Sequence, residues 1–441
     1  MVPRRGPLNM GITFIQKSTP ANRPPKPQIG LVLAGGAVTG GAFKLGGICA
    51  LDDILSRRKI VDFDIYVGLS AGALLAAPLA AGIPPAQLMA ALGGEGELAD
   101  FRLRDFYRPN FSEMVTKPIE FVTDLLSYLP GAAAEVLLRS PATYRRLQEP
   151  LEACTRAPSR DALERLANEV LRGLRTHRRF PFALDYLPAG AFDNSGIESF
   201  LRRGFAARGI SNNFETLLRE RGKKLYVAAV NLDTAERVIF GPEQGELLSI
   251  SEAVQASTAM PGFYKPARLR GVDYVDGGVR RTANIDIAIE QGADLIIAYN
   301  PFRPFNNRPQ IRGGRLADGS TLSDRGLFVV MNQVFRAMLH SRLHLGLQQY
   351  REDPRFQGDI LLIEPGDSDE TFFRMFPLDF RARREAAEHG YLSVTRSINA
   401  HRERLAEVLK PYSVELHKVP TGEGFSPIGS EETPLSRAAR S

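Results

Sequence analysis

Apolar positions along the first hundred residues follow two repeating patterns. Residues 29–34 (IGLVLA) form an uninterrupted apolar run, which predicts a buried strand of a parallel sheet, and a glycine-rich turn and a helical pattern follow it. Residues 63–68 (FDIYVG) repeat the strand pattern, and residues 70–82 (SAGALLAAPLAAG) repeat the helical one. This strand–helix order predicts βαβ units and an α/β fold around a mostly parallel sheet.

The middle of the chain has a different pattern. Residues 97–215 are amphipathic, aromatic and rich in arginine, with no strong strand signal, which predicts a helical insertion or cap. Strand patterns resume at 223–241, where two runs flank the turn NLDTAE and predict a hairpin. A last long helix is predicted over about 381–410.

One uncharged stretch raises the question of a membrane span. Residues 65–94 carry no charged side chain and are long enough to cross a bilayer. Gly82 and the two prolines that follow it soon afterwards interrupt the stretch, and its first part is β-branched and aromatic. We therefore expect short buried elements here instead of a span. The N-terminal residues 1–28 lack the long apolar run of a signal peptide.

Composition narrows the protein class. The 441 residues are 44% hydrophobic and 24% charged, as in a soluble globular protein, with a formal net charge of +6. The only two cysteines, Cys49 and Cys154, exclude a disulfide framework and a cysteine-based metal site. Cys49 lies in an apolar helical pattern, which predicts a buried thiol. We expect a cytoplasmic protein with peripheral contact with a membrane.

Residues 68–72 (GLSAG) place one serine between glycines where a predicted strand gives way to a helix. This context is typical of a nucleophile elbow, in which glycines permit a tight turn and the serine hydroxyl stands above the sheet edge. The amino terminus of the next helix offers N–H groups and a positive dipole end to an oxyanion. Ser70 is therefore a candidate nucleophile, and the structural alternative is that it only caps the helix.

A catalytic serine needs a base, and histidine is the usual one. The six histidines are His177, His340, His344, His389, His401 and His417. None stands in the loop directly after a core strand. His340 and His344 lie one turn apart in an apolar-periodic helix, which favours packing or surface roles, and His177 lies in a solvated arginine-rich segment. The elbow also comes too early in the chain for an α/β-hydrolase.

A carboxylate offers an alternative base. Asp276 ends a predicted strand and precedes Gly277 and Gly278, which leave room beside its side chain. Because the carboxyl ends of parallel strands share one edge of a sheet, we expect Asp276 to meet Ser70 and to act as its base. An ordinary Asp-Gly turn is the competing interpretation.

The turn after the first strand, residues 33–41 (LAGGAVTGG), contains successive backbone N–H groups that can form an anion nest. The sequence has neither the P-loop signature nor a clean dinucleotide fingerprint, which disfavours a nucleotide site and a dehydrogenase. An oxyanion hole uses the same donors, and this turn lies beside the strand that precedes Ser70. We therefore expect the turn to stabilise a tetrahedral intermediate.

The order of these motifs resembles that of the patatin-like phospholipase family. The glycine-rich turn comes first, then GLSAG, then the DGG of residues 276–278. Residues 225–241 (LYVAAVNLDTAERVIFG) and 253–266 (AVQASTAMPGFYKP) are similar to the family's segments before its DG[AG] motif. The resemblance implies a three-layer α/β/α fold with a mostly parallel central sheet, a helical insertion and a helical C-terminal part.

The resemblance also suggests a division of the chain. The expected parts are a disordered, basic and proline-rich arm (1–28), a patatin-like catalytic domain (29–301) with a helical insertion or cap (97–215), a C-terminal helical extension that completes the α/β domain (302–418), and a disordered tail (419–441).

The family uses a Ser-Asp dyad without histidine, and no cofactor or metal is implied. Carried over by position, Ser70 is the nucleophile and Asp276 the base. The oxyanion turn corresponds to Gly35, Gly36 and Ala37, and the motif glycines are Gly68, Gly72, Gly277 and Gly278.

Two positions depart from the family's G-G-G-x-[RK]-G. Ala37 replaces the third glycine and still carries an N–H, so the hole survives if the backbone conformation is permitted. Thr39 replaces the basic residue, which leaves that residue's role open, and Lys44 is not assumed to take it over.

The leading functional hypothesis is a serine esterase of lipid metabolism that cleaves ester bonds of phospholipids or other lipids through an acyl-serine intermediate. The alternative is a catalytically weak protein of the same fold that acts by membrane or partner binding, and Thr39 is its one supporting feature. A lipid substrate is expected, and a nucleic-acid partner is not. Residues 118–138 combine apolar amphipathicity with an arginine-rich segment after them, which is typical of an interfacial element as well as of a packed cap helix.

Overall fold

The computed structural model describes residues 11–21, 24–94, 103–156, 159–173, 181–244, 248–307 and 319–417. Two compact units are present, one formed by residues 1–108 and 192–441 and the other by residues 109–191. The bounds expected for the insertion (97–215) and for the N-terminal arm (1–28) remain predictions. The expected tail of 419–441 lies outside the described residues.

The first unit is built on one large sheet with the strand order β1-β12-β11-β2-β3-β6-β10-β9, and β7 pairs with β6 outside this order. The strands are β1 (Ile12–Gln16), β2 (Ile29–Leu33), β3 (Ile65–Leu69), β6 (Lys224–Asn231), β7 (Arg237–Phe240), β9 (Ala267–Leu269), β10 (Val272–Asp276), β11 (Leu295–Tyr299) and β12 (Asp359–Ile363). The five central strands, β12 to β6, run parallel, and β1, β7, β9 and β10 run antiparallel to their neighbours. The expected mostly parallel sheet is confirmed.

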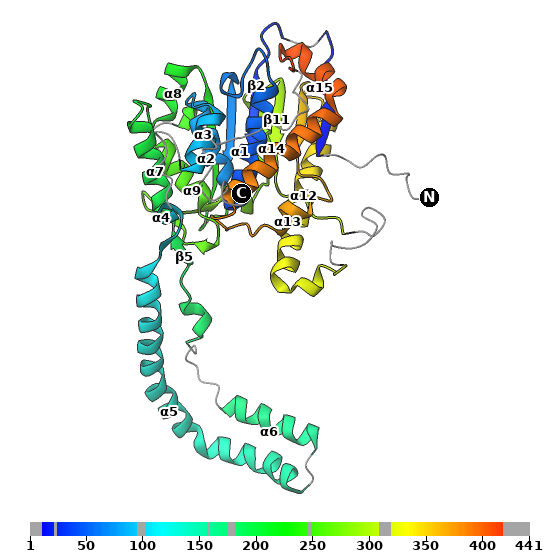
Figure 1. Ribbon diagram of the computed structural model, residues 1–441. Helices are drawn as coiled ribbons and strands as arrows, with labels where there is room; N and C mark the ends of the chain where they lie inside the picture. The colour runs from blue at the N-terminus through cyan, green and yellow to red at the C-terminus, as the bar shows by residue number, and fades with distance from the viewer. Residues whose placement is uncertain are drawn as a thin grey trace, which may run out of the picture. The chain divides into compact units, whose positions relative to one another are not determined.

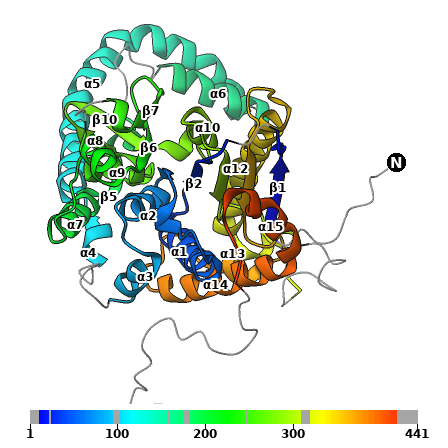
Figure 2. The ribbon, with the colours of Figure 1, turned by 90° about the horizontal axis from the view of Figure 1, so that it is seen from above.

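Helices cover both faces of this sheet, as Figures 1 and 2 show. The helices of this unit are α1 (Ala37–Ile54), α2 (Ala71–Ala80), α3 (Pro85–Gly93), α4 (Leu103–Phe106), α7 (Ser195–Ala206), α8 (Phe214–Arg221), α9 (Ile250–Thr258), α10 (Ile285–Glu290), α12 (Leu327–Glu352), α13 (Glu370–Arg374), α14 (Arg383–Ala400) and α15 (Arg402–Leu409). Short 3₁₀ turns are η1 (Ile60–Asp62), η3 (Pro242–Gln244), η4 (Gly277–Val279), η5 (Ser323–Arg325) and η6 (Lys410–Tyr412).

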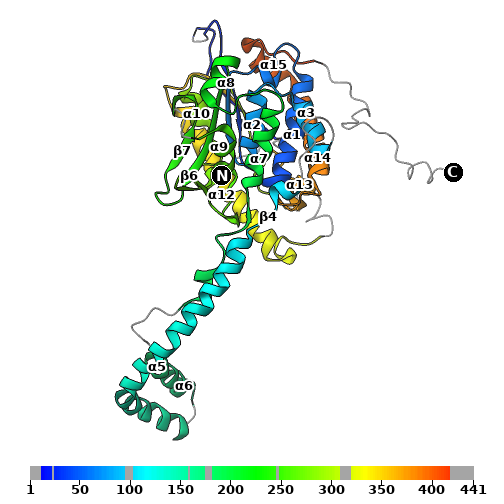
Figure 3. The same cartoon turned by 90° about the vertical axis from the view of Figure 1, so that its left-hand side faces the viewer.

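The strands are buried on both faces, which explains their continuous apolar runs. Leu31 and Leu33 point into a core filled by α1, α2, α9 and α14, whereas Val32 points into a second core filled by α10 and α12. Figure 3 shows α10 on one side of the strands and α1, α2 and α14 on the other. The result is the three-layer α/β/α architecture that the sequence predicts.

The second unit is helical. It contains α5 (Phe111–Arg156), α6 (Arg160–Gly173), which packs against α5, and the 3₁₀ turn η2 (Ala183–Tyr186). The remaining short strands of the chain are β4 (Arg108–Pro109), β5 (Gly190–Asp193) and β8 (Gly262–Tyr264). Within the described ranges, every helix is too short or too polar to cross a bilayer.

The uncharged stretch of residues 65–94 divides as the sequence predicts. It forms β3, α2 and α3, and Gly82 breaks the chain between the two helices with a φ of 87°. Cys49 is buried on α1, also as expected.

Two expectations need correction. The arm of residues 1–28 is not wholly disordered, because Ile12–Gln16 form β1, an edge strand paired in register with β12 through partners such as Ile12 and Ile363. Ile12 and Ile15 of this strand are buried, and their apolar surface stabilises the pairing. The single long helix expected over 381–410 is two helices, α14 and α15, which meet at His401.

Candidate active site

Ser70 occupies a strained turn between β3 and α2. Its φ of 55° and ψ of −128° lie outside the regions that L-residues favour, as in a nucleophile elbow. The Ser70 side chain makes no capping hydrogen bond to α2, so the structure does not support the helix-cap alternative. Steric crowding explains why glycine occupies both motif positions. A Cβ on Gly68 would lie 2.4 Å from Ala73 Cα, and a Cβ on Gly72 would lie 2.1 Å from the Leu33 carbonyl oxygen.

A second serine, Ser257, holds the backbone of the elbow through hydrogen bonds. The Ser70 amide donates a hydrogen bond of 2.8 Å to Ser257 Oγ, and the Ser257 hydroxyl donates one of 2.7 Å to the carbonyl oxygen of Ala228 on β6. Ser257 lies on α9 and is fully buried. Sequence reasoning singled out the segment that contains Ser257 but assigned this residue no role. A hydroxyl among apolar helix positions is the signal that identifies it, because a buried hydroxyl needs partners.

Asp276 lies next to Ser70, close enough for the Ser70 hydroxyl to lower the pKa of its carboxyl. The two residues are neighbours for a different structural reason than the sequence suggested. β10 runs antiparallel to β6, so Asp276 does not share a carboxyl edge with Ser70; instead the register pairs Asp276 with Ala229, one residue beyond the Ala228 that pairs with Leu69 of β3. The assumption of parallel strands was wrong, and the strand register alone sets this neighbourhood.

The carboxylate of Asp276 is held in a fixed orientation. Its Oδ1 accepts a hydrogen bond of 2.8 Å from the Gly278 amide, and its own amide donates to the Ala259 carbonyl. A Cβ on Gly277 would lie 2.6 Å from Leu69 Cδ1, so the DGG turn packs against β3 only with glycine there. Burial raises the pKa of the Asp276 carboxyl to about 6, although hydrogen bonds from Ser70 and Gly278 and the charge of Lys44 oppose this shift.

Lys44 of α1 lies fully buried beneath the turn that precedes α1. Its ammonium donates hydrogen bonds to the carbonyl oxygens of Ala34 and Gly35, and the bond to Gly35 is 3.0 Å long. The positive charge of Lys44 also attracts the carboxylate of Asp276. Burial lowers the pKa of Lys44 to about 7, and Asp276 opposes this shift. The sequence alone gives Lys44 no role, although a lysine on an otherwise apolar side of a helix is the signal of such a site.

The glycine-rich turn lies directly beside the elbow, since a Cβ on Gly35 would lie 3.5 Å from Ser70 Cβ. The amides of Val38 and Thr39 both donate to the Pro377 carbonyl oxygen, at 3.0 and 3.1 Å. Among the hydrogen bonds of the described residues, the amides of Gly36 and Ala37 have no acceptor. These two N–H groups are therefore available to a bound oxyanion.

The departures from the family pattern have local explanations. Ala37 adopts a φ of 51°, a left-handed conformation that alanine reaches at a cost of about 1–2 kcal/mol. Thr39 is buried, and its hydroxyl donates a hydrogen bond of 3.3 Å to the Pro377 carbonyl oxygen. It therefore links the turn to the segment before α14, whereas the family's basic residue would carry a charge here.

A mainly apolar cavity opens beside Ser70. Its volume is about 120 Å³, and it lies between α1, α2, α3 and α7. Aliphatic and aromatic side chains such as Leu74, Leu92 and Phe205 line it, and no histidine is among its lining residues in the described part of the chain. The cavity matches a long apolar ligand held at the serine.

The histidines have other partners. His389 Nε2 lies 2.8 Å from the Asp369 carboxylate, and His401 Nδ1 lies 2.9 Å from the Ser397 carbonyl oxygen. His177 lies outside the described residues. His340 and His344, for which the sequence favoured packing or surface roles, are partly exposed, and both face the buried carboxylate of Glu364.

Known proteins resemble this chain over different extents. The family model for patatin-like phospholipase matches residues 31–289. The uncharacterized protein YjjU of Escherichia coli K12 is 32% identical over 81 residues, which are 18% of this chain and only 22% of YjjU.

Solved structures are similar at lower identity. VipD from Legionella pneumophila is 17% identical with a TM-score of 0.36, over 91% of this chain and 72% of VipD. The human GIVD cytosolic phospholipase A2 in complex with methyl gamma-linolenyl fluorophosphonate is 14% identical with a TM-score of 0.34, over 88% of this chain and 59% of that one. The family match covers more than half of the sequence and contains the elbow, the glycine-rich turn and the DGG turn, so the chain belongs to the patatin-like phospholipase family of lipid hydrolases.

Proposed function

We propose that this protein is a serine acyl hydrolase that cleaves ester bonds of phospholipids or related lipids through an acyl-Ser70 intermediate, with Asp276 as the general base. The observation that carries the proposal is a buried carboxyl, Asp276, next to a serine that stands on a strained elbow at an apolar cavity. A carboxyl whose pKa is about 6 accepts a proton near neutral pH better than an ordinary aspartate does.

The proposed reaction has two halves. Ser70 Oγ attacks the ester carbonyl carbon while its proton passes to Asp276, and the amides of Gly36 and Ala37 stabilise the negative oxygen. The carbon–oxygen bond to the alcohol breaks, and Asp276 returns the proton to the leaving oxygen. Water then attacks the acyl-serine, its proton passes to Asp276 and on to Ser70 Oγ, and the carboxylic acid leaves.

Hydrolysis of a lipid panel by the full-length protein tests this proposal. The panel comprises diacyl phospholipids, lysophospholipids and neutral glycerides, and Ser70→Ala serves as the blank. Release of fatty acid that depends on Ser70 supports the proposal and identifies the lipid class. Equal, background release by both proteins contradicts it and favours the catalytically weak alternative.

The pH dependence of kcat/KM provides a separate prediction. Asp276 accepts a proton only when ionised, so kcat/KM should fall about tenfold per pH unit as the pH drops below about 6. Lys44→Met removes a positive charge that lowers the pKa of Asp276, so the acidic limb should move to higher pH. A flat profile between pH 5 and 7, or a limb that moves to lower pH in Lys44→Met, would contradict the assignment of Asp276.

The cavity predicts selectivity for long acyl chains. Ala91 of α3 lines the cavity, so Ala91→Phe should fill part of it and lower kcat/KM for a long-chain ester by about tenfold or more, while a short-chain ester is spared. Ala86→Phe, at an exposed position of the same helix, is the matched control and should leave both substrates unaffected. If Ala91→Phe lowers both rates equally, the cavity does not bind the acyl chain.

We further propose that the exposed apolar stripe of α5 contacts a membrane surface. Ile119, Val122 and Leu126 are 60%, 52% and 62% exposed and lie at helical spacing. Phe121 of the same helix does not belong to this stripe, because it is half-buried and its ring packs against that of Tyr186, with centroids 5.3 Å apart. Apolar side chains of this kind insert at the level of the headgroups and acyl chains.

Replacement of these three residues by aspartate should therefore lower activity on phospholipid vesicles while sparing a soluble short-chain ester. Thr123→Asp with Ser127→Asp adds charge at neighbouring exposed positions of α5 and should have the smaller effect. A vesicle co-sedimentation assay measures binding directly. If both substrates suffer equally, α5 does not act at the interface.

A further inference from the structure

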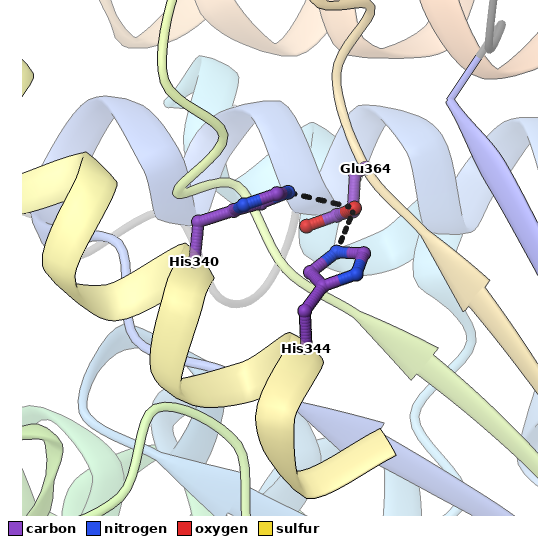
Figure 4. Close-up of side chains that lie close together, drawn as sticks. All are labelled: His340, His344 and Glu364. Carbon is purple, nitrogen blue, oxygen red and sulfur yellow. Dashed lines mark hydrogen bonds and ion pairs between the residues drawn. The ribbon is translucent and has the colours of Figure 1, made fainter. Parts of the chain in front are cut away.

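Two histidines and one glutamate converge at a point that the proposed hydrolytic mechanism does not use. His340 and His344 lie one helical turn apart on α12, and Glu364 directly follows β12. Figure 4 shows both imidazole rings directed at the Glu364 carboxylate. Nε2 of His344 lies 3.1 Å and Nε2 of His340 lies 3.6 Å from the same oxygen, Oε2.

These distances match the spacing of ligands around one ion. Zinc–ligand bonds of about 2.0–2.2 Å place neighbouring tetrahedral ligands roughly 3.3–3.5 Å apart. One candidate ligand atom from each of the three residues lies within 4.8 Å of the other two. The cluster therefore needs little rearrangement to enclose a cation of this size.

The hydrogen bonds around the cluster leave the required atoms free. His340 Nε2 is buried and has no hydrogen-bond partner, because 3.6 Å from the carboxylate exceeds a hydrogen bond. Glu364 is 4% exposed, and its other oxygen, Oε1, accepts a hydrogen bond of 2.9 Å from the fully buried Asn300. Such an outer partner orients a ligating carboxylate in metal sites.

The two imidazole rings also lie close together, with centroids 4.0 Å apart and an interplanar angle of 34°. A divalent cation bound by both rings and the carboxylate would give the buried His340 Nε2 the partner that it lacks.

We propose that His340, His344 and Glu364 bind a divalent transition-metal ion of the zinc class. Imidazole nitrogen favours such ions over Mg²⁺ and Ca²⁺, which prefer oxygen ligands. Of the three side chains, those of His340 and His344 are 24% and 35% exposed, whereas Glu364 is buried.

We expect the ion to stabilise the packing of α12 against the sheet, because two of its ligands lie on α12 and the third directly follows β12. Ser341 follows His340, where the H-E-x-x-H motif of metalloproteases carries its general base, so hydrolysis at this ion is not expected. On the same helix, Arg342 donates hydrogen bonds of 2.6 and 2.9 Å to the carbonyl oxygens of Gly278 and Val279, in the turn after Asp276. The metal site is inferred independently of the proposed hydrolase function, and either can fail without the other.

Calorimetric titration of the chelator-treated, full-length protein with Zn²⁺ alone tests the site. We expect one equivalent to bind, a rise in the thermal unfolding midpoint with added Zn²⁺, and the visible absorption of four-coordinate Co²⁺ when Co²⁺ replaces it. Glu364→Gln and His340→Gln with His344→Gln should abolish these signals, and Asn300→Ala should weaken binding about 10–100-fold. His401→Gln, which removes a histidine elsewhere, should bind as the wild type does.

Thermal unfolding without metal identifies any variant that fails to fold. Glu364→Gln is chosen because glutamine has nearly the same shape as glutamate, so the variant is expected to fold. The proposal is overturned if the wild type binds no more Zn²⁺ than the double histidine variant. It is also overturned if Mg²⁺ binds as tightly as Zn²⁺ does.

Discussion

Asp276→Asn should reduce lipid hydrolysis by about 10³-fold or more and should also raise the free energy of unfolding at pH 7. The activity falls because the amide cannot take the Ser70 proton, and positioned bases of this kind contribute about 10²–10⁴-fold. Ser70→Ala should be equally inactive, because it removes the nucleophile itself. Assays with a soluble ester and with vesicles measure both losses.

The stability gain follows from the pKa of Asp276. Its pKa of about 6 in the folded protein exceeds the ordinary aspartate pKa of 3.8, so the folded state binds more protons than the unfolded state between these pH values. Stability conferred by the neutral form is therefore present at low pH and is lost as the pH rises from about 4 to about 6. Asparagine stays neutral, and a shift of two pKa units corresponds to about 3 kcal/mol at pH 7.

Urea denaturation at pH 7 measures this gain. Asp273→Asn, on the same strand and partly exposed, is the matched control and should retain activity without the gain. His389→Ala and His401→Ala should retain most activity, since each has a partner outside the cavity. A histidine variant as inactive as Ser70→Ala would refute the dyad.

Gly36→Ala should lower turnover by about 10²–10³-fold, the usual effect of losing an oxyanion donor. Its Cβ would lie 2.9 Å from the Gly40 carbonyl carbon and 2.9 Å from Pro301 Cγ, so the turn must shift and carry the Gly36 and Ala37 amides with it. The same clash should cost some stability, and kcat is therefore compared at a temperature where circular dichroism shows the folded protein.

Ala37→Gly is the matched control for this turn. It keeps the N–H group and relieves the left-handed strain at a φ of 51°, so turnover should stay within about twofold of the wild type and the free energy of unfolding should rise by about 1 kcal/mol. Wild-type turnover in Gly36→Ala would exclude this turn from the mechanism.

The sequence predicts the parallel core well because burial on both faces leaves continuous apolar runs, as at β2 and β3. It does not predict β1, since five residues with mixed burial gain their partner, β12, more than 340 positions later in the chain. The antiparallel course of β10 is equally hidden, because strand direction leaves no periodic signal.

The candidate site shows the same division. Ser70, Asp276 and the glycines around them carry motif spacings that local chemistry explains. Lys44 and Ser257 contact the turn and the elbow through partners on other elements, so only the folded chain reveals their positions. The His340 and His344 pair was visible in the sequence, but Glu364 was not recognisable as its third member.

Covalent trapping of the acyl-enzyme shows directly whether Ser70 is the nucleophile. Full-length protein is mixed with an activated long-chain ester, quenched in acid within the first turnover and digested, and the peptides are analysed by mass spectrometry. We expect one acyl group on Ser70, accumulation of this adduct in a burst, and no adduct in Ser70→Ala. Hydrolysis without any adduct, or an acyl group on another residue that persists in Ser70→Ala, would contradict this expectation.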